Sequence, residues 1–295
     1  MRDFHHLSVL QDAVVALLAP RPGAYFVDGT LGGGGHAELL LEAGVTLLGV
    51  DRDPAALAAA SARLARFGAR FTAVHAPFSR IPSLVDRPVD GILLDIGVSS
   101  PQLDNPERGF SFQHDGPLDL RMDPTSGDPA SVWLDRLGEA ELADILYQNA
   151  EERLSRRISR AILAARPILR TRQLAEVVAS VVPPSGRIHP ATRTFQALRI
   201  LVNDELGELD RALTTFPGLL SPGGRFAVIS FHSLEDRPVK ECFRALAGVG
   251  ASTDLYGNPL VTPSFRLVER KARLGETDPN PRARSARLRA IEKIP

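Results

Sequence analysis

The sequence predicts an α/β fold whose doubly wound sheet is interrupted by a block of helices. Five short apolar runs with strand character recur at the spacing typical of such a fold: 24–28, 46–51, 71–75, 90–95 and 225–230. The alternation of strand and helix stops after Asp95 and resumes only before the last of these runs. Two later β-like runs, 265–268 and 286–291, indicate an edge hairpin. We therefore expect a parallel sheet with an antiparallel edge strand and an all-helical insertion.

The first two predicted strands enclose the most informative stretch of the chain. The run 24–28 ends in Asp28 and leads into four clustered glycines, Gly32 to Gly35, and the run 46–51 ends in Asp51. In a doubly wound sheet, glycines at this point let the backbone approach a nucleoside, and the acid of the second strand binds the ribose hydroxyls. A cofactor with an adenosine half is the expected ligand.

Start signals and composition define the next segments. Asp53 is a suitable N-cap, and Pro54 fits the first position, of a helix that reaches Phe67. Residues 101–128 are rich in Pro, Gly and Asp, yet they contain Phe and Leu side chains that need burial. This stretch is therefore expected to be an ordered loop.

Residues 131–216 show helical patterns alone. The last of these patterns opens at His189 and predicts one helix with a continuous apolar stripe: Phe195, Leu198, Leu201, Val202, Leu206, Leu209 and Leu213. We expect residues 1–104 and 217–295 to form the sheet domain. Residues 105–216 are expected to form a helical insertion that recognises the substrate.

Composition narrows the class of protein. Of the 295 residues, 44% are hydrophobic and 24% are charged, which is ordinary for a globular protein. No apolar run reaches the ~20 residues that a membrane span needs, and the first residues lack the basic segment and cleavage site of a signal peptide. A single cysteine, Cys242, excludes an internal disulfide. We expect a cytoplasmic protein that makes no membrane contact.

The net charge is zero, but the charges are unevenly distributed. Residues 151–200 hold ten Lys and Arg against three Asp and Glu, and residues 251–295 hold nine against five. The densest arginine segments run from Arg153 to Arg172 and from Arg266 to Arg289. Either segment alone is best explained by solvated helix faces that pair with acids. Together with a nucleoside-binding core they favour a nucleic-acid substrate.

Asp28 distinguishes between two adenosine cofactors. A dinucleotide such as NAD would place its pyrophosphate over the glycine turn, where a carboxylate would repel it. The cationic amino group of S-adenosyl-L-methionine would be attracted to the same carboxylate. Three residues also separate Asp28 from Gly32, the first of the clustered glycines, whereas the dinucleotide fold normally runs straight from the strand into its first glycine. We therefore expect S-adenosyl-L-methionine, with Asp28 at its amino group.

The fourth predicted strand ends in Asp95, followed by small residues that include Ser99 and Ser100. Exocyclic amines of cytosine and adenine are poor nucleophiles because their lone pair is delocalised into the ring. Acceptors at a strand end can hold the N–H bonds and direct the lone pair at the methyl carbon, so orientation supplies much of the rate. Asp95 is accordingly the expected catalytic carboxylate, and Ser99 and Ser100 are candidate substrate contacts.

The longer motifs resemble those of one family along nearly the whole chain. In order they are His6 with Val9-Leu10, Asp28 through His36, Asp51 through Pro54, Pro77-Phe78-Ser79, Asp95 through Phe112, Asp115 through Asp119, Arg121 through Pro124, His189 through Ala197, Ser230 through Arg237 and Asn280 through Ser285. The family consists of bacterial S-adenosylmethionine-dependent methyltransferases that modify the exocyclic N4 of a cytidine in the decoding region of 16S rRNA. The resemblance implies a Rossmann-like methyltransferase sheet. It also implies cytosine-1402 as the target and the small ribosomal subunit as the partner.

The resemblance further implies which residues hold the cofactor. They are Gly34, Gly35, His36, Asp51, Phe78, Asp95 and Gln102. The side chain of Phe78 can pack on adenine, and Gln102 can bond a polar edge of the cofactor. For His36, a role as a helix cap or packing group is as plausible as a direct contact.

Further site residues are hypotheses from their position. His232 and Ser233 follow the fifth predicted strand and are candidate catalytic contacts to the cytosine. Arg193, Arg199, Arg282 and Arg284 are candidate RNA contacts, although a structural salt bridge is equally plausible for Arg193 and Arg199. No metal is expected, because no histidine pair has ligand spacing. Cys242 lies in a helical pattern and is expected to pack rather than to attack a pyrimidine ring.

Two alternatives remain open from the residues themselves. An NAD-dependent oxidoreductase would use the same glycine loop. A non-enzymatic ribosome assembly factor would retain the fold with a vestigial cofactor pocket. The acids expected at the strand ends argue against the second alternative.

Overall fold

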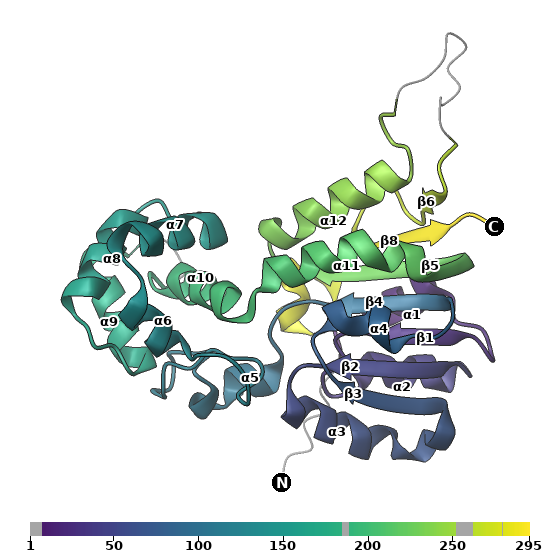
Figure 1. The fold of residues 1–295 in the computed structure, drawn as a ribbon, viewed down its shortest axis with the longest axis horizontal. Coiled ribbons are helices and arrows are strands. Elements are labelled where there is room, and N and C mark those ends of the chain that lie inside the picture. Colours follow the sequence, from purple (N-terminus) through teal and green to yellow (C-terminus); the bar gives the residue numbers. More distant parts are fainter. Residues whose placement is uncertain (1–7, 185–188, 252–261, 279) are drawn as a thin grey trace. The chain divides into compact units, whose positions relative to one another are not determined.

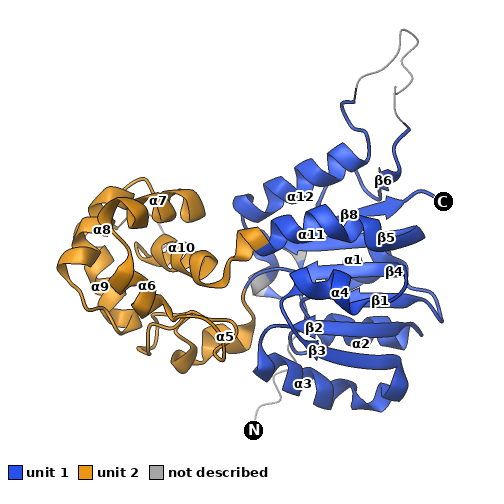
Figure 2. Ribbon diagram, in the orientation of Figure 1, with its two compact units in different colours: residues 1–97, 208–295 blue, residues 98–207 orange. Residues whose placement is uncertain are grey.

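The computed structural model describes residues 8–184, 189–251, 262–278 and 280–295 (Figure 1). The chain divides into two compact units, one made of residues 1–97 and 208–295 and the other of residues 98–207 (Figure 2). Each unit has its own hydrophobic core, and each is described by itself below.

The first unit is built on an eight-stranded sheet whose main strand order is β3-β2-β1-β4-β5-β8-β6. Its parallel strands are β1 (Tyr25–Asp28), β2 (Thr46–Asp51), β3 (Phe71–His75), β4 (Val89–Asp95) and β5 (Leu220–Ser230). Antiparallel to β5 runs β8 (Arg287–Lys293), which pairs with both β6 (Phe265–Leu267) and β7 (Arg273–Leu274). The predicted parallel sheet with its antiparallel edge is confirmed.

Helices flank this sheet and define two cores. The helices are α1 (Gln11–Leu18), α2 (Gly35–Glu42), α3 (Pro54–Leu64), α4 (Ile81–Leu84), α11 (Glu205–Leu219) and α12 (Ser233–Leu246). Side chains of a strand alternate between the faces of a sheet, so Phe26 packs in the core of α1, α2 and α3. Its neighbour Val27 packs in the core of α4, α11 and α12. Short 3₁₀ turns lie at Ala65–Arg70, Phe78–Arg80, Gly275–Thr277 and Pro281–Ser285.

The start of α3 follows the sequence prediction. The side chain of Asp53 accepts a hydrogen bond from the backbone N–H of Ala55 at 3.0 Å, and Pro54 occupies the first helical position. Asp53 thereby satisfies a backbone donor at the helix N-terminus, as an N-cap does. The helix itself ends at Leu64, and a 3₁₀ turn continues to Arg70.

The second unit is helical. It contains α5 (Ser100–Asp104), α6 (Ala130–Arg136), α7 (Glu139–Ala150), α8 (Ser155–Ala164), α9 (Thr171–Val181) and α10 (Thr192–Asn203), with a 3₁₀ turn at Pro106–Arg108. The loop after α5 is ordered, as predicted, and buries Leu118 and Leu120 in the core of this unit. Asn203 fixes the loop, because its side chain accepts from the N–H of Met122 at 2.7 Å and donates to the carbonyl of Leu120 at 2.8 Å.

The single long helix predicted from His189 onward is wrong. Asp204 adopts a left-handed conformation (φ 48°, ψ 40°) that separates α10 from α11. Phe195 belongs to the core of the helical unit, whereas Leu209 belongs to the core of the sheet unit. The boundary between the units therefore falls at Gly207, and most of α11 packs with the sheet instead of the insertion.

None of the described helices is long and apolar enough to cross a membrane.

Truncation of Phe226 on β5 tests how much the core between the sheet and helices α4, α11 and α12 contributes to stability. Its ring lies 5.6 Å from that of Phe216 and 5.4 Å from that of Phe243, and all three side chains are buried. The Phe226→Ala substitution should lower the free energy of unfolding by about 3–5 kcal/mol, measured by urea denaturation. Leu274→Ala, at an exposed position, is the control and should change stability little. Equal effects of the two substitutions would contradict this prediction.

Candidate active site

The carboxyl ends of three neighbouring parallel strands each carry an aspartate. Asp28 ends β1, Asp51 ends β2 and Asp95 ends β4. In the strand register Asp28 lies opposite Gly49 of β2 and Leu93 of β4, so the three ends lie at one edge of the sheet. Ligands of open α/β sheets bind outside this edge. The three aspartates therefore occupy the expected position of a ligand site.

Asp28 is the most deeply buried of the three, with 1% of its surface exposed. Burial raises the pKa of its carboxyl to about 7, although the charge of His36 and the N–H of Thr30 oppose the increase. That N–H donates to Oδ1 at 3.1 Å. The negative charges of Asp95 and Asp51 raise the pKa further. A cationic ligand group would stabilise the ionised form of Asp28.

The loop after β1 is tied to the neighbouring strands. The N–H of Asp95 donates to the Thr30 hydroxyl at 2.6 Å. The N–H of Leu31 donates to the carbonyl of Val50 at 3.0 Å, and the N–H of Gly32 donates to Asp51 Oδ2 at 2.7 Å. Thr30 thus joins the ends of β1 and β4, a role that the sequence analysis missed although the residue stands two positions after Asp28.

The backbone at position 34 favours glycine over any other residue. Its φ of +80° lies in the left-handed region, and a Cβ there would lie 3.1 Å from Leu64 Cδ1. The residue also forms the N-cap of α2, so the backbone turns sharply where the helix begins. The N–H of Gly34 donates to the carbonyl of Leu31 at 2.8 Å, whereas N–H groups in the first turn of a helix have no partner within the helix and can bind an electronegative ligand atom. Gly33, in contrast, faces open space and could carry a larger side chain.

Asp51 has a structural role besides its predicted one. Its Oδ1 accepts from the N–H of Asp53 at 2.8 Å, while Oδ2 holds Gly32. Burial raises the pKa of this carboxyl, and the two backbone hydrogen bonds oppose the increase. Each oxygen of a carboxylate can accept more than one hydrogen bond. The expected bonds to ribose hydroxyls are therefore compatible with this geometry.

The buried His36 and the partly buried Asp95 form a pair with unused bonding capacity. His36 Nε2 lies 3.6 Å from Asp95 Oδ2, which is too far for a hydrogen bond. Within the described part of the chain, both ring nitrogens of His36 and Oδ1 of Asp95 lack a hydrogen-bond partner. Buried polar atoms normally have partners. These atoms, the glycine turn and the acidic edge together fit a polar, cationic cofactor.

Phe78 begins the 3₁₀ turn after β3 and is partly buried. A Cβ on Gly29 would lie 3.2 Å from Phe78 Cβ, so the absence of a side chain at Gly29 lets this turn approach the end of β1. The next residue, Ser79, is held by Glu208, whose carboxylate accepts from the serine N–H at 3.1 Å and from its hydroxyl at 2.9 Å. The backbone beside Phe78 is therefore anchored.

His232 and Ser233 open α12 at the end of β5. His232 is the N-cap, and its Nε2 lies 2.8 Å from Glu235 Oε1. Oε2 of Glu235 accepts from the N–H of Phe231 at 2.8 Å. Ser233 is exposed. The buried Glu235 thus positions this segment, and its place three residues after the N-cap is the sequence signal that would have identified it.

Three predicted site residues lie together in the helical unit. Ser99 is the N-cap of α5, and its N–H donates to Gln102 Oε1 at 2.9 Å. Ser100 and Gln102 are both buried. This capping box fixes the orientation of the Gln102 side chain, whose amide group carries donor hydrogens as well as the acceptor oxygen.

The candidate RNA-binding arginines differ in their surroundings. Arg199 forms two hydrogen bonds with Glu205, at 2.7 and 2.8 Å, and both side chains are largely buried. Arg193 is exposed and donates to the carbonyl of Glu151. Arg199 therefore forms the structural salt bridge that was the alternative to RNA binding, whereas Arg193 faces solvent.

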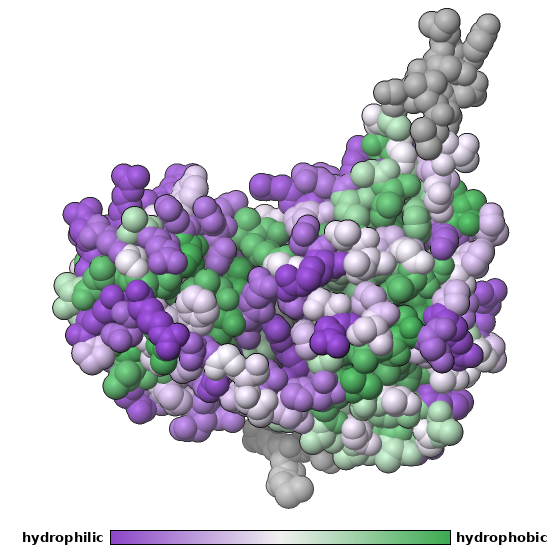
Figure 3. Space-filling model, in the orientation of Figure 1, coloured by the Kyte–Doolittle hydropathy of each residue, from purple (hydrophilic) through white to green (hydrophobic). Residues whose placement is uncertain are grey.

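The arginine-dense segments also differ from each other. In the first segment the following arginines are exposed: Arg153, Arg156, Arg157 and Arg160. Hydrophilic residues are frequent on the face of the helical unit drawn in Figure 3. In the second segment, Arg287 and Arg289 bind Asp236 of α12. Burial would raise the pKa of Asp236, but the two arginines outweigh it and hold that pKa below its usual value.

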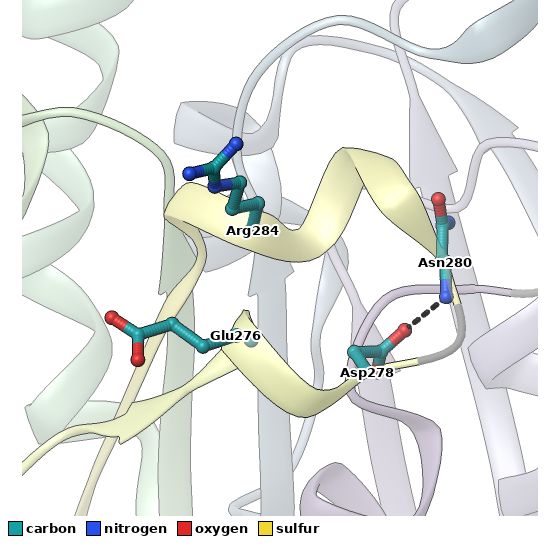
Figure 4. A pocket seen from close by; sticks show the side chains of 5 residues that line it. Glu276, Asp278, Asn280 and Arg284 are labelled. Atoms are coloured by element: carbon teal, nitrogen blue, oxygen red, sulfur yellow. Dashed lines mark hydrogen bonds between the residues drawn. The ribbon is translucent and has the colours of Figure 1, made fainter.

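Arg284 lines a polar pocket of about 620 Å³ in the sheet unit (Figure 4). Glu276, Asp278 and Asn280 line the same pocket. Asp278 accepts from the N–H of Asn280 at 2.8 Å and from the N–H of Leu10 at 2.8 Å, so it links this segment to the start of α1. The side chain of Arg282 lies outside the described residues.

Cys242 lies on α12 and packs against the core that the sheet forms with α4, α11 and α12. Burial raises the pKa of its thiol, which disfavours the nucleophilic thiolate.

Known proteins of one family match this chain over nearly its whole length. A family model described as the MraW methylase family matches residues 3–294. The chain is 53% identical over 309 residues to the ribosomal RNA small subunit methyltransferase H of Anaeromyxobacter dehalogenans, with 99% of each chain covered. It is 49% identical over 312 residues to the protein of the same name from Trichlorobacter lovleyi, with both chains fully covered.

Solved structures are more distant. An rRNA methylase from Streptococcus thermophilus covers 97% of this chain with 12% identity and a TM-score of 0.40. The description of the fold therefore rests on the strand order given above.

Asp28 should make stability depend on pH. Because its pKa is about 7 in the folded protein and 3.8 as the reference value, its contribution to stability is fully present below pH 3.8 and is lost as the pH rises through about 7. Asp28→Asn should therefore gain stability relative to the wild type across this range, by at most about 4 kcal/mol. Urea denaturation of both proteins between pH 4 and 8 measures the difference. A difference that does not change with pH would refute the assignment.

Proposed function

Because the chain belongs to the MraW methylase family, we propose that it transfers a methyl group from S-adenosyl-L-methionine to the exocyclic N4 of a cytidine in the decoding region of 16S rRNA. The family predicted from the sequence motifs is confirmed. The observation that carries the proposal is the set of acids at one sheet edge, namely Asp28, Asp51 and Asp95, with His36 beside them. The NAD-dependent oxidoreductase is set aside, since the family is one of methylases.

The residues at the sheet edge suit the two ends of the cofactor. The carboxylate of Asp51 would accept hydrogen bonds from the ribose hydroxyls, and Phe78 would pack on the adenine. Asp28 would lie near the amino group, where the charge of the ligand offsets the cost of ionising a buried acid. Backbone atoms of Gly34 and Gly35 would complete the set in the sheet unit, and the family resemblance adds Gln102. The bound cofactor supplies an electrophilic methyl group.

Asp95 would act on the base. Its carboxylate would accept an N–H of the cytosine amine and turn the nitrogen lone pair toward the methyl carbon. Orientation of this kind can supply several kcal/mol, on the order of 7–11 at best. His232 at the N-terminus of α12 would contact the same base, and the exposed Ser233 hydroxyl would bond its edge.

The RNA would be bound through its backbone and through one extruded base. A base paired or stacked in an RNA structure must leave its position before an enzyme can act on its amine. The exposed arginines Arg153, Arg156, Arg157 and Arg160, together with Arg193, Arg282 and Arg284, would neutralise phosphates. We assign substrate recognition to the helical insertion, with Ser99 and Ser100 as candidate contacts. The partner would be the small ribosomal subunit, which is assembled in the cytoplasm.

Methyl transfer from labelled cofactor to small subunits that lack the modification tests this function. The wild type should place label on N4 of one cytidine, identified by mass spectrometry of the digested rRNA. Asp95→Ala should lower kcat by at least about 100-fold, because the amine loses its orientation. Asp86→Ala is a matched control, since Asp86 is exposed and precedes β4 at the opposite end. Label on another nucleoside, or normal turnover by Asp95→Ala, would contradict the proposal. Binding of RNA without any transfer would favour the assembly factor.

Asp51→Ala should act mainly on cofactor affinity. Loss of hydrogen bonds to a charged acceptor costs about 1.5–3 kcal/mol each, so KM for S-adenosyl-L-methionine should rise by about 10- to 100-fold while kcat changes less. Steady-state kinetics measures both constants, and circular dichroism checks that the variant is folded without its bonds to Gly32 and Asp53. A lower kcat at unchanged KM would contradict the ribose assignment.

A further inference from the structure

His36 is a buried polar side chain whose bonding capacity is unused in the sheet unit. It lies on the first turn of α2 and is 6% exposed. Neither ring nitrogen has a hydrogen-bond partner among the residues that the structure describes. An unpaired polar group in the interior is costly. A purely structural histidine would be expected to bond its surroundings, so this ring is placed for a partner that acts in the reaction.

The charges around His36 are mostly negative. Asp95 of β4 faces it, with 3.6 Å between Oδ2 and Nε2. Asp28 of β1 also interacts with it, because the charge of His36 lowers the pKa of Asp28. On α2 itself, Glu38 is neutralised by Arg63, whose Nε donates to it at 2.8 Å. The negative charge of Asp51, on β2, raises the pKa of Asp28. An imidazole between carboxylates can accept a proton and hold it.

We propose, building on the function proposed above, that Asp95 and His36 together accept the proton that the cytosine amine loses on methylation. The amine begins with two hydrogens. Its lone pair forms the N–C bond as the C–S bond breaks, and the electron pair of the C–S bond remains on sulfur. One N–H bond then breaks, its electron pair returns to N4, and the proton passes to Asp95 Oδ2 and from there to His36 Nε2. The product amine carries one hydrogen and one methyl group.

The separation of the pair is compatible with this transfer. At 3.6 Å the two atoms are not hydrogen-bonded, but catalytic hydrogen bonds are often long without substrate and shorten in the complex. Asp95 has 23% of its side chain exposed, whereas His36 has 6%. The carboxylate can therefore contact the base while the imidazole stays behind it. The proton returns to solvent by the same route when the product leaves.

The kinetic test compares two histidine variants of the full chain acting on small subunits that lack the modification. His36→Gln keeps a polar side chain but cannot take up a proton, and its kcat should fall by about 100-fold. The pH profile of kcat should change as well, because the amide of glutamine does not take up a proton. His75→Gln is the matched control, because the His75 side chain is exposed and its Nε2 lies 2.9 Å from the carbonyl oxygen of Arg52. Its kcat and pH profile should equal those of the wild type.

A second measurement does not depend on activity. The ring ¹⁵N resonances of His36, observed by NMR in the protein without ligands, should shift in Asp95→Asn and stay unchanged in Asp86→Asn. Calorimetry with S-adenosylhomocysteine measures how far His36→Gln changes cofactor affinity, so that a loss of kcat is separated from a loss of binding.

The outcomes separate the two proposals. If the wild type transfers no methyl group to cytidine N4, the proposed function fails, and the NMR result alone then decides whether the pair is coupled. If the wild type is active and His36→Gln retains its kcat and pH profile, the inference is overturned. A variant that loses affinity for S-adenosylhomocysteine in proportion to its activity, with an unchanged pH profile, would show His36 to be structural and would overturn it too.

Discussion

Crowding of carboxylates at the end of a parallel sheet is the constraint on which the site depends. Parallel strands bring Asp28, Asp51 and Asp95 to one edge because their register places all three ends side by side. Burial and mutual repulsion disfavour the ionised form of Asp28, and its pKa rises to about 7. The backbone N–H of Thr30 offsets part of this cost for Asp28, and the N–H of Gly32 does the same for Asp51. A cofactor that carries a sulfonium and an ammonium group would supply the remaining positive charge.

The same constraint explains how the loops around the edge are built. Thr30 joins β1 to β4, and Asp51 holds both Gly32 and Asp53. Asp51 therefore has structural hydrogen bonds in addition to its proposed contact with the ribose, and Thr30 holds the loop in place. Pre-organisation of this kind keeps the groups in place before the ligand arrives, which reduces the entropy lost on binding.

The arginines show how a composition argument is limited by tertiary contacts. The sequence favoured RNA binding for two arginine-dense segments. In the structure Arg287 and Arg289 neutralise Asp236, so part of the second segment stabilises β8 against α12. The exposed arginines of α8 keep the expected solvent-facing position. Counting charges along the chain cannot separate these cases, because the partner of Arg289 lies 53 residues away in sequence.

The sequence by itself determined the strands, the glycine loop and the acids that end β1, β2 and β4, because these follow from local apolar patterns and from the shared edge of a parallel sheet. It also determined the family, since the long motifs are local as well. Only the tertiary structure decided that Asp204 divides the helix predicted after His189, because an unbroken apolar stripe does not reveal that its two halves pack in different cores. Only the tertiary structure revealed the structural bonds of Thr30, Glu235 and Arg199 and the unpaired ring of His36, since hydrogen-bond partners are fixed by distances in the folded chain.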